Sequence, residues 1–369
     1  MSQPKVLLIG GYGGFGARLA RRLAGDGWAV LVAGRNPAKA QAFAANLPNA
    51  KGLAADRRHD LTGLFRQMRP LLVIDAAGPF QDSDYRVVEA CIAAGCNYLD
   101  LADARDFVCG IGVLDDAARK AGVAVITGAS SVPALSGAVV RALAAGFDRL
   151  ETIELAISAS DRAVAGASVS EAILAYAGKP IEMRRGGRWQ SVAGWSEVRR
   201  IDYRVTGAEH LSRSVALVDV PDLAILPAAY PEVKSVTFRA GPEYSFQVRA
   251  LWLASWLVRL GIVRSLVGLA RWVAPMQRLT ARWCSDRSAM SVRIGGSHGG
   301  RAAEAGWTLI AERGDGPEIP TLAAQLFARR IRDGLVQPGA RHAGSDLDLE
   351  DFSPLFAEIA VVTELVSPA

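Results

Sequence analysis

Cysteine is scarce in this sequence of 369 residues: there are four, at positions 91, 96, 109 and 284. No two of them form a CxxC pair, and a chain of this length would need many more to be held by a disulfide framework. We therefore expect unbridged, inert thiols, including Cys109, and a reducing compartment. No charged region followed by an apolar region and a cleavage site opens the sequence, so we predict a cytoplasmic protein without a secretion signal.

Histidine is equally scarce, with four residues at 59, 210, 298 and 342 that show no metal-ligand spacing. The sequence also lacks the G-x-S-x-G elbow of many serine hydrolases. We therefore predict neither a metal site nor a hydrolase of that kind.

An excess of basic charge is confined to one segment. The net charge is +5, and residues 248–287 alone contribute +6 through seven arginines and Asp286, so the remainder sums to −1. A basic balance that belongs to one segment argues against general nucleic-acid binding, and no motif of a nucleic-acid-binding module is present. We predict no nucleic-acid partner.

Composition and length indicate a folded protein of two domains. Half of the residues are apolar and 21% are charged, and ordinary domains hold about 100–200 residues each. We place a first domain at 1–150 and a second at 151–339. We expect the C-terminal stretch 340–369, with a helix at 349–361, to pack back onto the first domain.

The first domain alternates between short apolar runs and amphipathic segments. This βαβα order with short loops is typical of a parallel sheet covered by helices on both faces. The expected strands are 5–10, 28–34, 53–56, 71–76, 97–101 and 123–127, and the expected helices are 15–26, 37–46, 60–69, 84–95 and 111–121.

The pattern becomes mixed after residue 150. Strands are expected at 151–158, 199–206, 214–220, 234–240, 288–296 and 304–312, and helices at 169–177, 250–282 and 320–334. The predicted fold class is therefore α/β, with an N-terminal Rossmann-type parallel sheet and a second α+β domain for substrate binding and dimerisation.

A glycine-rich loop follows the first expected strand. Gly11, Gly13 and Gly16 have the G-x-G-x-x-G spacing, between an apolar strand and a helix. Such glycines let the backbone approach a pyrophosphate, which the helix N-terminus attracts. We predict that the loop Gly11, Tyr12, Gly13, Gly14, Phe15 and Gly16 binds a dinucleotide. The alternative is a tight turn without a ligand.

The end of the second strand distinguishes the two nicotinamide cofactors. NAD-binding proteins usually place an acidic residue there, whereas this sequence has Gly34-Arg35-Asn36. A guanidinium suits a 2′-phosphate, so we predict NADP(H), bound in part by Arg35 and Asn36. The alternative is a solvated surface arginine.

Two further loops at the same sheet edge belong to the predicted cofactor site. Asp56, at the end of the third strand, is expected to flank the adenine. The loop after the fourth strand is expected to lie along the nicotinamide; it consists of Ala77, Gly78, Pro79 and Phe80. An ordinary turn is the alternative for that loop.

These residues together resemble a known family. The glycine loop, Ala33-Gly34-Arg35, Ala77-Gly78-Pro79-Phe80 and Gly128-Ala129-Ser130-Ser131-Val132-Pro133-Ala134 resemble the saccharopine dehydrogenase-like NADP-dependent oxidoreductases, best over the first 145 residues. The resemblance implies a Rossmann domain, an α+β domain and a nicotinamide at the cleft between them. True saccharopine reductases carry an aspartate where Val132 stands and an aromatic residue where Asp103 falls, so we do not expect a true saccharopine reductase.

A reductase needs a proton donor near the transferred hydride. We expect it where the fifth and sixth strands end, and Asp103 is the first candidate because it lies just beyond its strand. Asp103 could instead cap a helix at 104–109, and Asp100 could have a structural hydrogen-bonding role within its apolar strand. Ser130 and Ser131 are further candidates that could simply be turn residues.

Residues 248–283 form a basic, tryptophan-containing segment. Its longest uncharged stretch is nine residues, short of the ~20 that span a bilayer. On a helix, Arg249, Arg264, Arg271, Arg278 and Arg282 would share one face, although Pro275 must interrupt it. Packing on the domain or on a second subunit is one interpretation, and contact with a membrane surface or a lipid substrate is the other. The apolar surface elsewhere on the segment would be formed by Trp252, Trp256, Leu260 and Val263.

The sequence thus predicts an NADP(H)-dependent oxidoreductase that reduces a C=O, C=N or activated C=C bond of a small-molecule or lipid substrate. We expect a homo-oligomer, in the simplest case a dimer, with peripheral membrane contact through 248–283 as an open alternative. Two hypotheses of other classes remain: a non-catalytic NADP-binding sensor, because no proton donor is unambiguous, and a lipid-associated scaffold, because of the basic segment.

Overall fold

The computed structural model describes residues 3–161, 167–270, 272 and 283–368. The chain divides into two compact units: unit 1 comprises Met1–Ala134 and Pro317–Leu347, and unit 2 comprises Leu135–Gly316 and Asp348–Ala369. The chain therefore leaves unit 1 at residue 134 rather than 150, because helix α7 (Ser136–Ala144) packs on strands of unit 2. The stretch that returns to unit 1 is 317–347 rather than 340–369.

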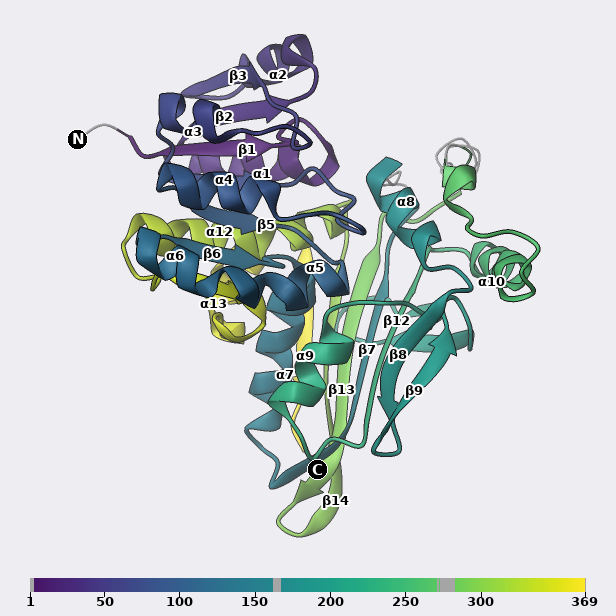
Figure 1. Ribbon diagram of the computed structural model, residues 1–369. Coiled ribbons are helices and arrows are strands. Elements are labelled where there is room, and N and C mark those ends of the chain that lie inside the picture. The colour runs from purple at the N-terminus through teal and green to yellow at the C-terminus, as the bar shows by residue number, and fades with distance from the viewer. Residues whose placement is uncertain (1–2, 162–166, 271, 273–282, 369) are drawn as a thin grey trace. The chain divides into compact units, whose positions relative to one another are not determined.

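Unit 1 is built on a parallel sheet of seven strands (Figure 1). Its order is β15-β6-β5-β4-β1-β2-β3, which contains the Rossmann order 3-2-1-4-5-6 and confirms the predicted fold class. The central strands are apolar runs such as Val6–Ile9 and Leu72–Ile74, because a parallel sheet is buried on both faces. The strands are β1 (Lys5–Ile9), β2 (Ala29–Gly34), β3 (Ala50–Ala54), β4 (Leu72–Asp75), β5 (Asn97–Asp100), β6 (Ala124–Thr127) and β15 (Gly339–His342).

The strand order changes direction between β1 and β4. Right-handed crossovers on the two sides of this point carry their helices to opposite faces of the sheet, and a crevice for ligands opens at the carboxyl ends of the strands there. The glycine loop after β1 and the 77–80 loop after β4 flank this switch point. The helices are α1 (Gly14–Gly25), α2 (Pro37–Ala44), α3 (Thr62–Met68), α4 (Arg86–Ala94), α5 (Arg105–Gly110), α6 (Asp115–Ala121) and α12 (Ile319–Arg332), with 3-10 turns at Ile111–Leu114 and Ala343–Ser345.

The returning stretch 317–347 completes unit 1 in two ways. Helix α12 packs against α1, and the ion pair between Arg329 Nε and Asp26 Oδ2, at 2.7 Å, fastens its C-terminal end. Strand β15 then pairs with β6 at the edge of the sheet, where the Ala340 amide donates to Asp115 Oδ1 at 2.8 Å. The sequence predicted neither the packing of α12 on α1 nor the pairing of β15 with β6.

Unit 2 contains a mixed sheet of seven strands in the order β10-β11-β12-β7-β13-β14-β16. Strands β7 and β12 are parallel and the other pairs are antiparallel, with helices α7 and α9 packed on the sheet. This mixed α/β arrangement agrees with the predicted α+β domain. The strands are β7 (Arg149–Ser158), β10 (Arg199–Tyr203), β11 (Leu211–Leu217), β12 (Ser235–Gly241), β13 (Ser288–His298), β14 (Arg301–Ala311) and β16 (Val361–Val366); a separate hairpin consists of β8 (Pro180–Arg185) and β9 (Arg188–Ala193).

Several predicted helices of unit 2 differ from the observed ones. The described helices are α7, α8 (Ala167–Ala175), α9 (Asp222–Ala229), α10 (Ser245–Arg259) and α13 (Leu349–Ala357), with 3-10 turns at Val267–Leu269 and Gly316–Glu318. The helix expected at 250–282 is α10, which ends at Arg259 before Gly261 with its positive φ, so Arg249 and Arg264 do not share one continuous helix. The expected residues Arg271, Pro275, Arg278 and Arg282 lie outside the described residues. Helix α13 stops at Ala357, short of 361, because Val361–Val366 pairs with β14.

Within the described residues, the structure contains no helix long and apolar enough to cross a membrane.

Candidate functional site

The glycine loop folds as its spacing predicts. Gly13 is the N-cap of α1, without a side-chain cap, and its N–H donates to Gly10 O at 2.8 Å. Gly16 is buried directly against the same Gly10 carbonyl, where a Cβ atom would collide with the backbone. Gly13 and Gly14 are exposed, and a Cβ on Gly14 would meet nothing within 4 Å. The loop therefore presents an open helix N-terminus that fits a pyrophosphate.

The side chain of Tyr12 lies on the turn that follows β2. Its hydroxyl oxygen accepts the N–H of Asn36 at 3.0 Å, and its ring covers Gly34 so closely that a Cβ there would lie 2.5 Å from Tyr12 Cε1. Tyr12 thus ties the glycine loop to the turn between β2 and α2. The sequence placed Tyr12 in the site, but it did not reveal this link.

The turn after β2 carries the predicted phosphate-binding arginine. Arg35 is exposed, and within the described part of the chain no hydrogen bond or ion pair occupies its guanidinium. Asn36 caps α2, because its Oδ1 accepts the N–H of Lys39 at 3.0 Å. Lys39 is exposed one turn further on. Two cationic side chains are therefore available to an anion at the end of β2.

Asp56 lies beyond the end of β3, which finishes at Ala54 rather than at 56. Its carboxylate is held by Arg58, with Nη2 to Oδ2 at 2.6 Å, and also accepts the Arg58 N–H at 3.1 Å. The hydrogen bonds from Arg58 hold the pKa of Asp56 well below its usual range. Asp56 is thus an ionised carboxylate that fixes the β3–α3 turn.

A residue missed by the sequence reasoning, Arg57, organises the 77–80 loop. Its Nε lies 3.0 Å from Oδ2 of Asp75, which is fully buried at the end of β4. Its Nη1 donates to Ala77 O at 3.3 Å and to Pro79 O at 3.2 Å. Asp75 Oδ1 meanwhile accepts the N–H of Ala77 at 2.9 Å. One buried ion pair therefore fixes the backbone of the predicted nicotinamide loop.

Phe80 supports this loop from within the protein. Its side chain is 4% exposed, and its ring centroid lies 5.3 Å from that of Phe107 and 4.5 Å from Arg57 Cζ. The structure therefore places Phe80 mainly in the core, whereas Ala77, Gly78 and Pro79 are half-buried at the surface of the loop. The cis Gly78–Pro79 peptide lies in the same turn.

Asp100 joins the ends of β5 and β6. Its Oδ1 accepts the N–H groups of Ala102 at 2.9 Å and Gly128 at 2.7 Å, and the Thr127 hydroxyl at 2.9 Å. Burial raises the pKa of Asp100 to about 6, although these three hydrogen bonds lower it. The structural role that competed with catalysis in the sequence reasoning is thus present in the geometry.

The remaining proton-donor candidates occupy different environments. Asp103 is exposed, and its Oδ1 accepts from Gln81 Nε2 at 3.4 Å. It does not cap the next helix, because α5 begins at Arg105 with Ala104 as an N-cap that makes no side-chain bond. Ser130 is 8% exposed, and Ser131, at the start of the turn Ser131–Leu135, is half-buried.

Hydrogen bonds bring three of the predicted loops together at the carboxyl edge of the sheet. Gln81, just after the 77–80 loop, reaches Asp103 after β5. Asp100 binds the Gly128 amide with its carboxylate, and its carbonyl accepts the N–H of Ala129 at 2.9 Å. The loops after β4, β5 and β6 therefore form one connected rim that contains the predicted catalytic residues.

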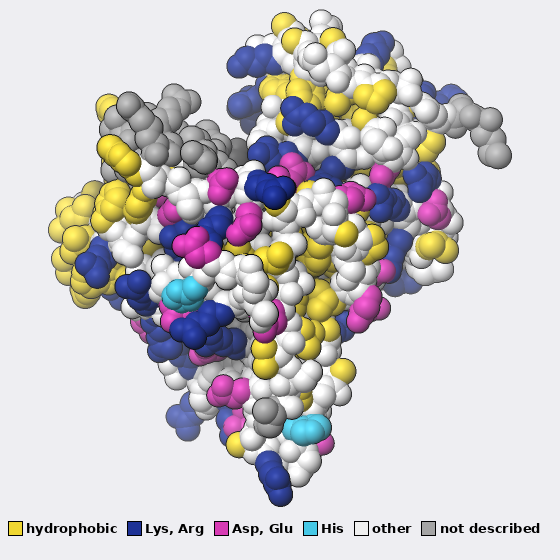
Figure 2. Space-filling model, turned by 180° about the vertical axis from the view of Figure 1, so that it is seen from behind, with side chains coloured by type: hydrophobic (Ala, Val, Ile, Leu, Met, Phe, Trp, Pro, Cys, Tyr) yellow, Lys and Arg dark blue, Asp and Glu magenta, His cyan; other side chains and the backbone are white. Residues whose placement is uncertain are grey.

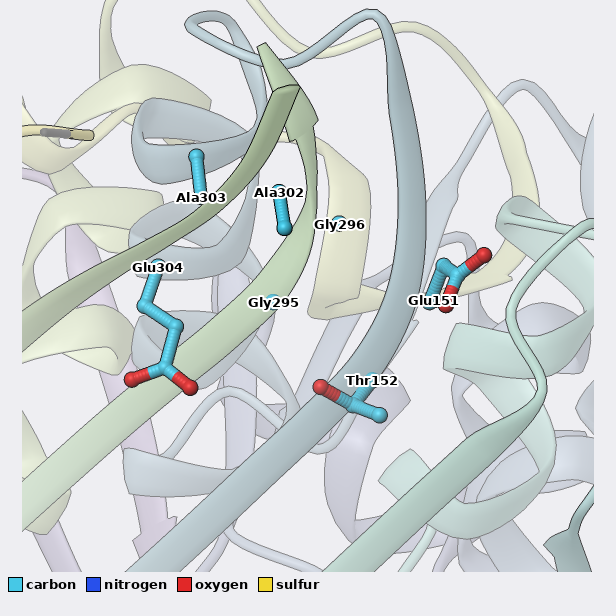
Figure 3. A pocket seen from close by; sticks show the side chains of 7 residues that line it. All are labelled: Glu151, Thr152, Gly295, Gly296, Ala302, Ala303 and Glu304. Carbon is cyan, nitrogen blue, oxygen red and sulfur yellow. The ribbon is translucent and has the colours of Figure 1, made fainter. Parts of the chain in front are cut away.

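Elsewhere, unit 2 has a shallow hollow on the surface of β7, β13 and β14 (Figure 3). It contains none of the predicted site residues, and Glu151 at its edge is already paired with Lys234 Nζ at 2.8 Å. Among the described residues, no three or more His, Cys, Asp or Glu side chains lie close enough together to hold a metal ion. We assign no function to this hollow, which is lined by Glu151, Thr152, Gly295, Gly296, Ala302, Ala303 and Glu304.

Residues 6–139 match the family model of the saccharopine dehydrogenase NADP binding domain. This match lies almost entirely within unit 1, and it confirms the predicted resemblance and the NADP(H) cofactor. No curated protein matches the sequence.

Among solved structures, the chain is similar to an amine dehydrogenase from Mycobacterium smegmatis, with 10% identity, a TM-score of 0.50 and coverage of 93% of this chain and 95% of that one. It is also similar to an engineered D-amino acid dehydrogenase bound to NADP+, with 13% identity, a TM-score of 0.48 and coverage of 95% and 98%. At 10% identity, the likeness to the amine dehydrogenase concerns the fold alone.

Proposed function

We propose that this protein is an NADP(H)-dependent oxidoreductase that reduces a C=O, C=N or activated C=C bond of a small-molecule substrate. The observation that carries the proposal is the combination of an open glycine loop at the N-terminus of α1 with an exposed Arg35 at the end of β2, whose guanidinium has no partner within the described residues. The first feature suits a pyrophosphate and the second suits the 2′-phosphate that distinguishes NADP(H) from NAD(H).

Each loop of the site has a separate task in this proposal. The amides at Gly14–Gly16 bind the pyrophosphate, and Tyr12 holds the turn that presents Arg35. The loop 77–80, fixed by Arg57 and Asp75, lies along the nicotinamide, which supplies a hydride when bound.

Asp103 is the proposed proton donor at the substrate. It is exposed at the rim, whereas Asp100 is fully buried and its Oδ1 is engaged by three donors. A proton held at the Asp103 carboxyl can reach a substrate above the carboxyl edge of the sheet, and Gln81 orients that carboxyl.

The first experiment is a fluorescence titration of the purified chain with NADPH and with NADH. We expect NADPH to bind at least about tenfold more tightly, because a charge-assisted contact to phosphate is worth ~1.5–3 kcal/mol. Equal affinities, or a preference for NADH, would contradict the assignment of Arg35.

The second experiment follows NADPH oxidation with a panel of ketones, imines and enoyl compounds. With an active substrate, Asp103→Asn should lower kcat by about 100-fold. Asp106→Asn is the matched control, since Asp106 is also exposed and lies three residues further along the chain. Unchanged turnover in Asp103→Asn would remove Asp103 as the donor.

A non-catalytic NADP sensor is the second candidate. It is favoured because Asp100 is engaged in structural hydrogen bonds, so that only one of the two candidate aspartates, Asp103, is exposed to act as a proton donor. The two candidates differ in one measurement, because a sensor would bind NADPH tightly and oxidise it with no member of the panel.

A further inference from the structure

Helix α10 exposes an apolar face to solvent, whereas an ordinary surface helix exposes a polar one. It contacts unit 2 through one face, on which Val248 and Ser255 are fully buried. Phe246, Leu253 and Leu257 lie on the other face, because spacings of seven and four residues return to the same side of a helix. These three side chains are 52%, 61% and 41% exposed, so the solvent face is the apolar one.

The apolar surface continues beyond the end of α10. Leu260 and Ile262 are 66% and 64% exposed, and Leu269 in the following turn is 48% exposed. Trp272 and Trp283 are also exposed. Figure 2 shows hydrophobic side chains gathered over this part of unit 2, at the left of the view. Contiguous apolar surface of this kind marks an interaction site in a folded protein, whereas single exposed leucines do not.

The sequence that forms this surface contains basic residues and no acidic ones. The sequence from 244 to 285 contains six arginines and no aspartate or glutamate. Arg249, Arg259 and Arg264 are exposed among the apolar side chains, and Arg259 Cζ stacks 4.4 Å from the ring centroid of Trp256. The surface therefore combines leucine, tryptophan and arginine, which is the chemistry of a helix that lies in the headgroup region of an anionic bilayer.

Both ends of the segment are fastened at the same place in unit 2. Glu243 Oε1 accepts the N–H of Ser285 at 2.8 Å, and the same oxygen accepts from Arg213 Nη2 at 3.1 Å. Ser214 Oγ also donates to Ser245 Oγ at 2.9 Å, which attaches the start of α10 to β11. Glu243 and the start of α10 on one side, and Ser285 on the other, therefore meet unit 2 at one place, and the described apolar face of α10 points outward.

We propose that residues 246–270, together with Trp272, form a docking surface for an anionic membrane, on which α10 lies parallel to the bilayer plane. The apolar side chains enter the acyl boundary, and the arginines contact lipid phosphates. A second copy of this chain is the less suitable occupant, because a symmetric contact through this face would bring two acid-free, arginine-rich segments together.

The test is co-sedimentation of the full chain with vesicles. Vesicles of equimolar phosphatidylcholine and phosphatidylglycerol are compared with vesicles of phosphatidylcholine alone, at low and at high salt. We expect binding to the anionic vesicles to exceed binding to the neutral ones by at least about tenfold, and to weaken as salt screens the arginines.

Two variants separate the apolar and basic contributions. Leu253→Ser/Leu257→Ser should lower binding at least about tenfold without unfolding the chain, because both side chains are exposed. Val113→Ser/Leu335→Ser is its matched control in unit 1, where both residues are also exposed. Arg249→Gln/Arg264→Gln should remove the preference for anionic lipid, whereas Arg188→Gln/Arg301→Gln, at exposed sites outside the segment, should not.

The circular-dichroism spectrum and the urea-unfolding midpoint, unchanged from wild type, show that each variant is folded, independently of the outcome for membranes. Equal binding of wild type to both vesicle types, or unchanged binding in Leu253→Ser/Leu257→Ser, would overturn the proposal. The proposal would also be overturned if wild type sediments as a dimer that does not bind vesicles and Leu253→Ser/Leu257→Ser sediments as a monomer, because the surface would then join two copies of the chain.

Discussion

Arg57 and Asp75 form an ion pair beneath the loop 77–80, with 3.0 Å between Nε and Oδ2, and Asp75 is fully buried. Burial raises the pKa of Asp75, and the nearby guanidinium opposes this effect. The same guanidinium donates to two carbonyls of the loop. The pair thus connects the stability of β4 to the shape of the proposed nicotinamide loop.

Replacing the cation of this pair should affect both properties. In Arg57→Met, Asp75 becomes a buried charge without a partner, which typically costs about 3–5 kcal/mol of unfolding free energy. In Arg57→Met/Asp75→Asn, most of that stability should return while NADPH binding stays about tenfold weak, because the loop carbonyls still lack their donor. Urea unfolding and NADPH titration measure the two effects, and normal affinity in the double variant would show that Arg57 does not shape the site.

Tyr12→Phe should reduce cofactor discrimination. The change removes the acceptor of the Asn36 N–H and leaves the ring over Gly34, so the turn carrying Arg35 loses one hydrogen bond. A bond of this kind contributes about 1 kcal/mol, and we expect the ratio of NADPH to NADH affinity to fall about fivefold. Tyr85→Phe is the matched control, since it removes a hydroxyl that donates to Phe107 O at 2.8 Å. An equal fall in both variants would speak against a specific role for Tyr12.

Arg35→Gln should weaken NADPH binding by about 10–100-fold and leave NADH binding nearly unchanged. The reason is that only NADPH carries the 2′-phosphate that the guanidinium is proposed to neutralise. Lys51→Gln removes the same charge from another exposed site of unit 1, on β3, and should change neither affinity. If both variants lose NADPH affinity equally, general electrostatics and not Arg35 explains the preference.

Asp100→Asn should flatten the pH dependence of stability. Burial raises the pKa of Asp100 to about 6 in the folded chain, so the folded state binds a proton that the unfolded chain has already released. Its contribution to the unfolding free energy is therefore complete below about pH 4. About 2–3 kcal/mol of this contribution is lost as the pH rises through 6. Urea unfolding followed by circular dichroism at several pH values measures this loss. An unchanged profile in the variant would assign the pH dependence elsewhere.

Ser136→Ala should destabilise unit 2 more at high pH than at low pH. Ser136 Oγ donates to Asp222 Oδ1 at 2.5 Å, both side chains are buried, and burial raises the pKa of Asp222 to about 6. Above about pH 6, where Asp222 is charged, loss of this donor should lower the unfolding free energy by about 1–3 kcal/mol. Below about pH 6 the carboxyl is protonated, and the loss should be smaller. Equal destabilisation at pH 5 and pH 8 would mean that the loss comes from packing alone.

The sequence predicted the parts of unit 1 that follow from periodicity. The run from Val6 to Ile9 is apolar throughout because both faces of the sheet are covered. Gly13 and Gly16 are glycines because a Cβ atom there would crowd or collide with the Gly10 carbonyl. Strand β15 gave no such signal, since Gly339–His342 is four residues long and only partly apolar. Its pairing with β6 is a tertiary effect across more than two hundred residues.

In the site, the sequence identified loops but not their internal contacts. Arg57 was overlooked because an arginine after a strand has no distinctive spacing, and its value comes from Asp75 and the carbonyls around it. The hairpin β8–β9 was also missed, although Gly186-Gly187 between two β-rich runs is a recognised turn signal. Periodicity alone could not stop α10 at Arg259, where the structure shows a turn at Gly261.

Because unit 1 is assembled from residues 1–134 and 317–347, its sheet lacks an edge strand until nearly the whole polypeptide has been synthesised. During translation, the edge of β6 stays unpaired while residues 135–316 are synthesised, and exposed strand edges can pair with other chains. A chain truncated after residue 316 should therefore aggregate when it is expressed. A gene that joins residues 1–134 directly to 317–347 is the shortest one expected to yield unit 1 as a folded protein.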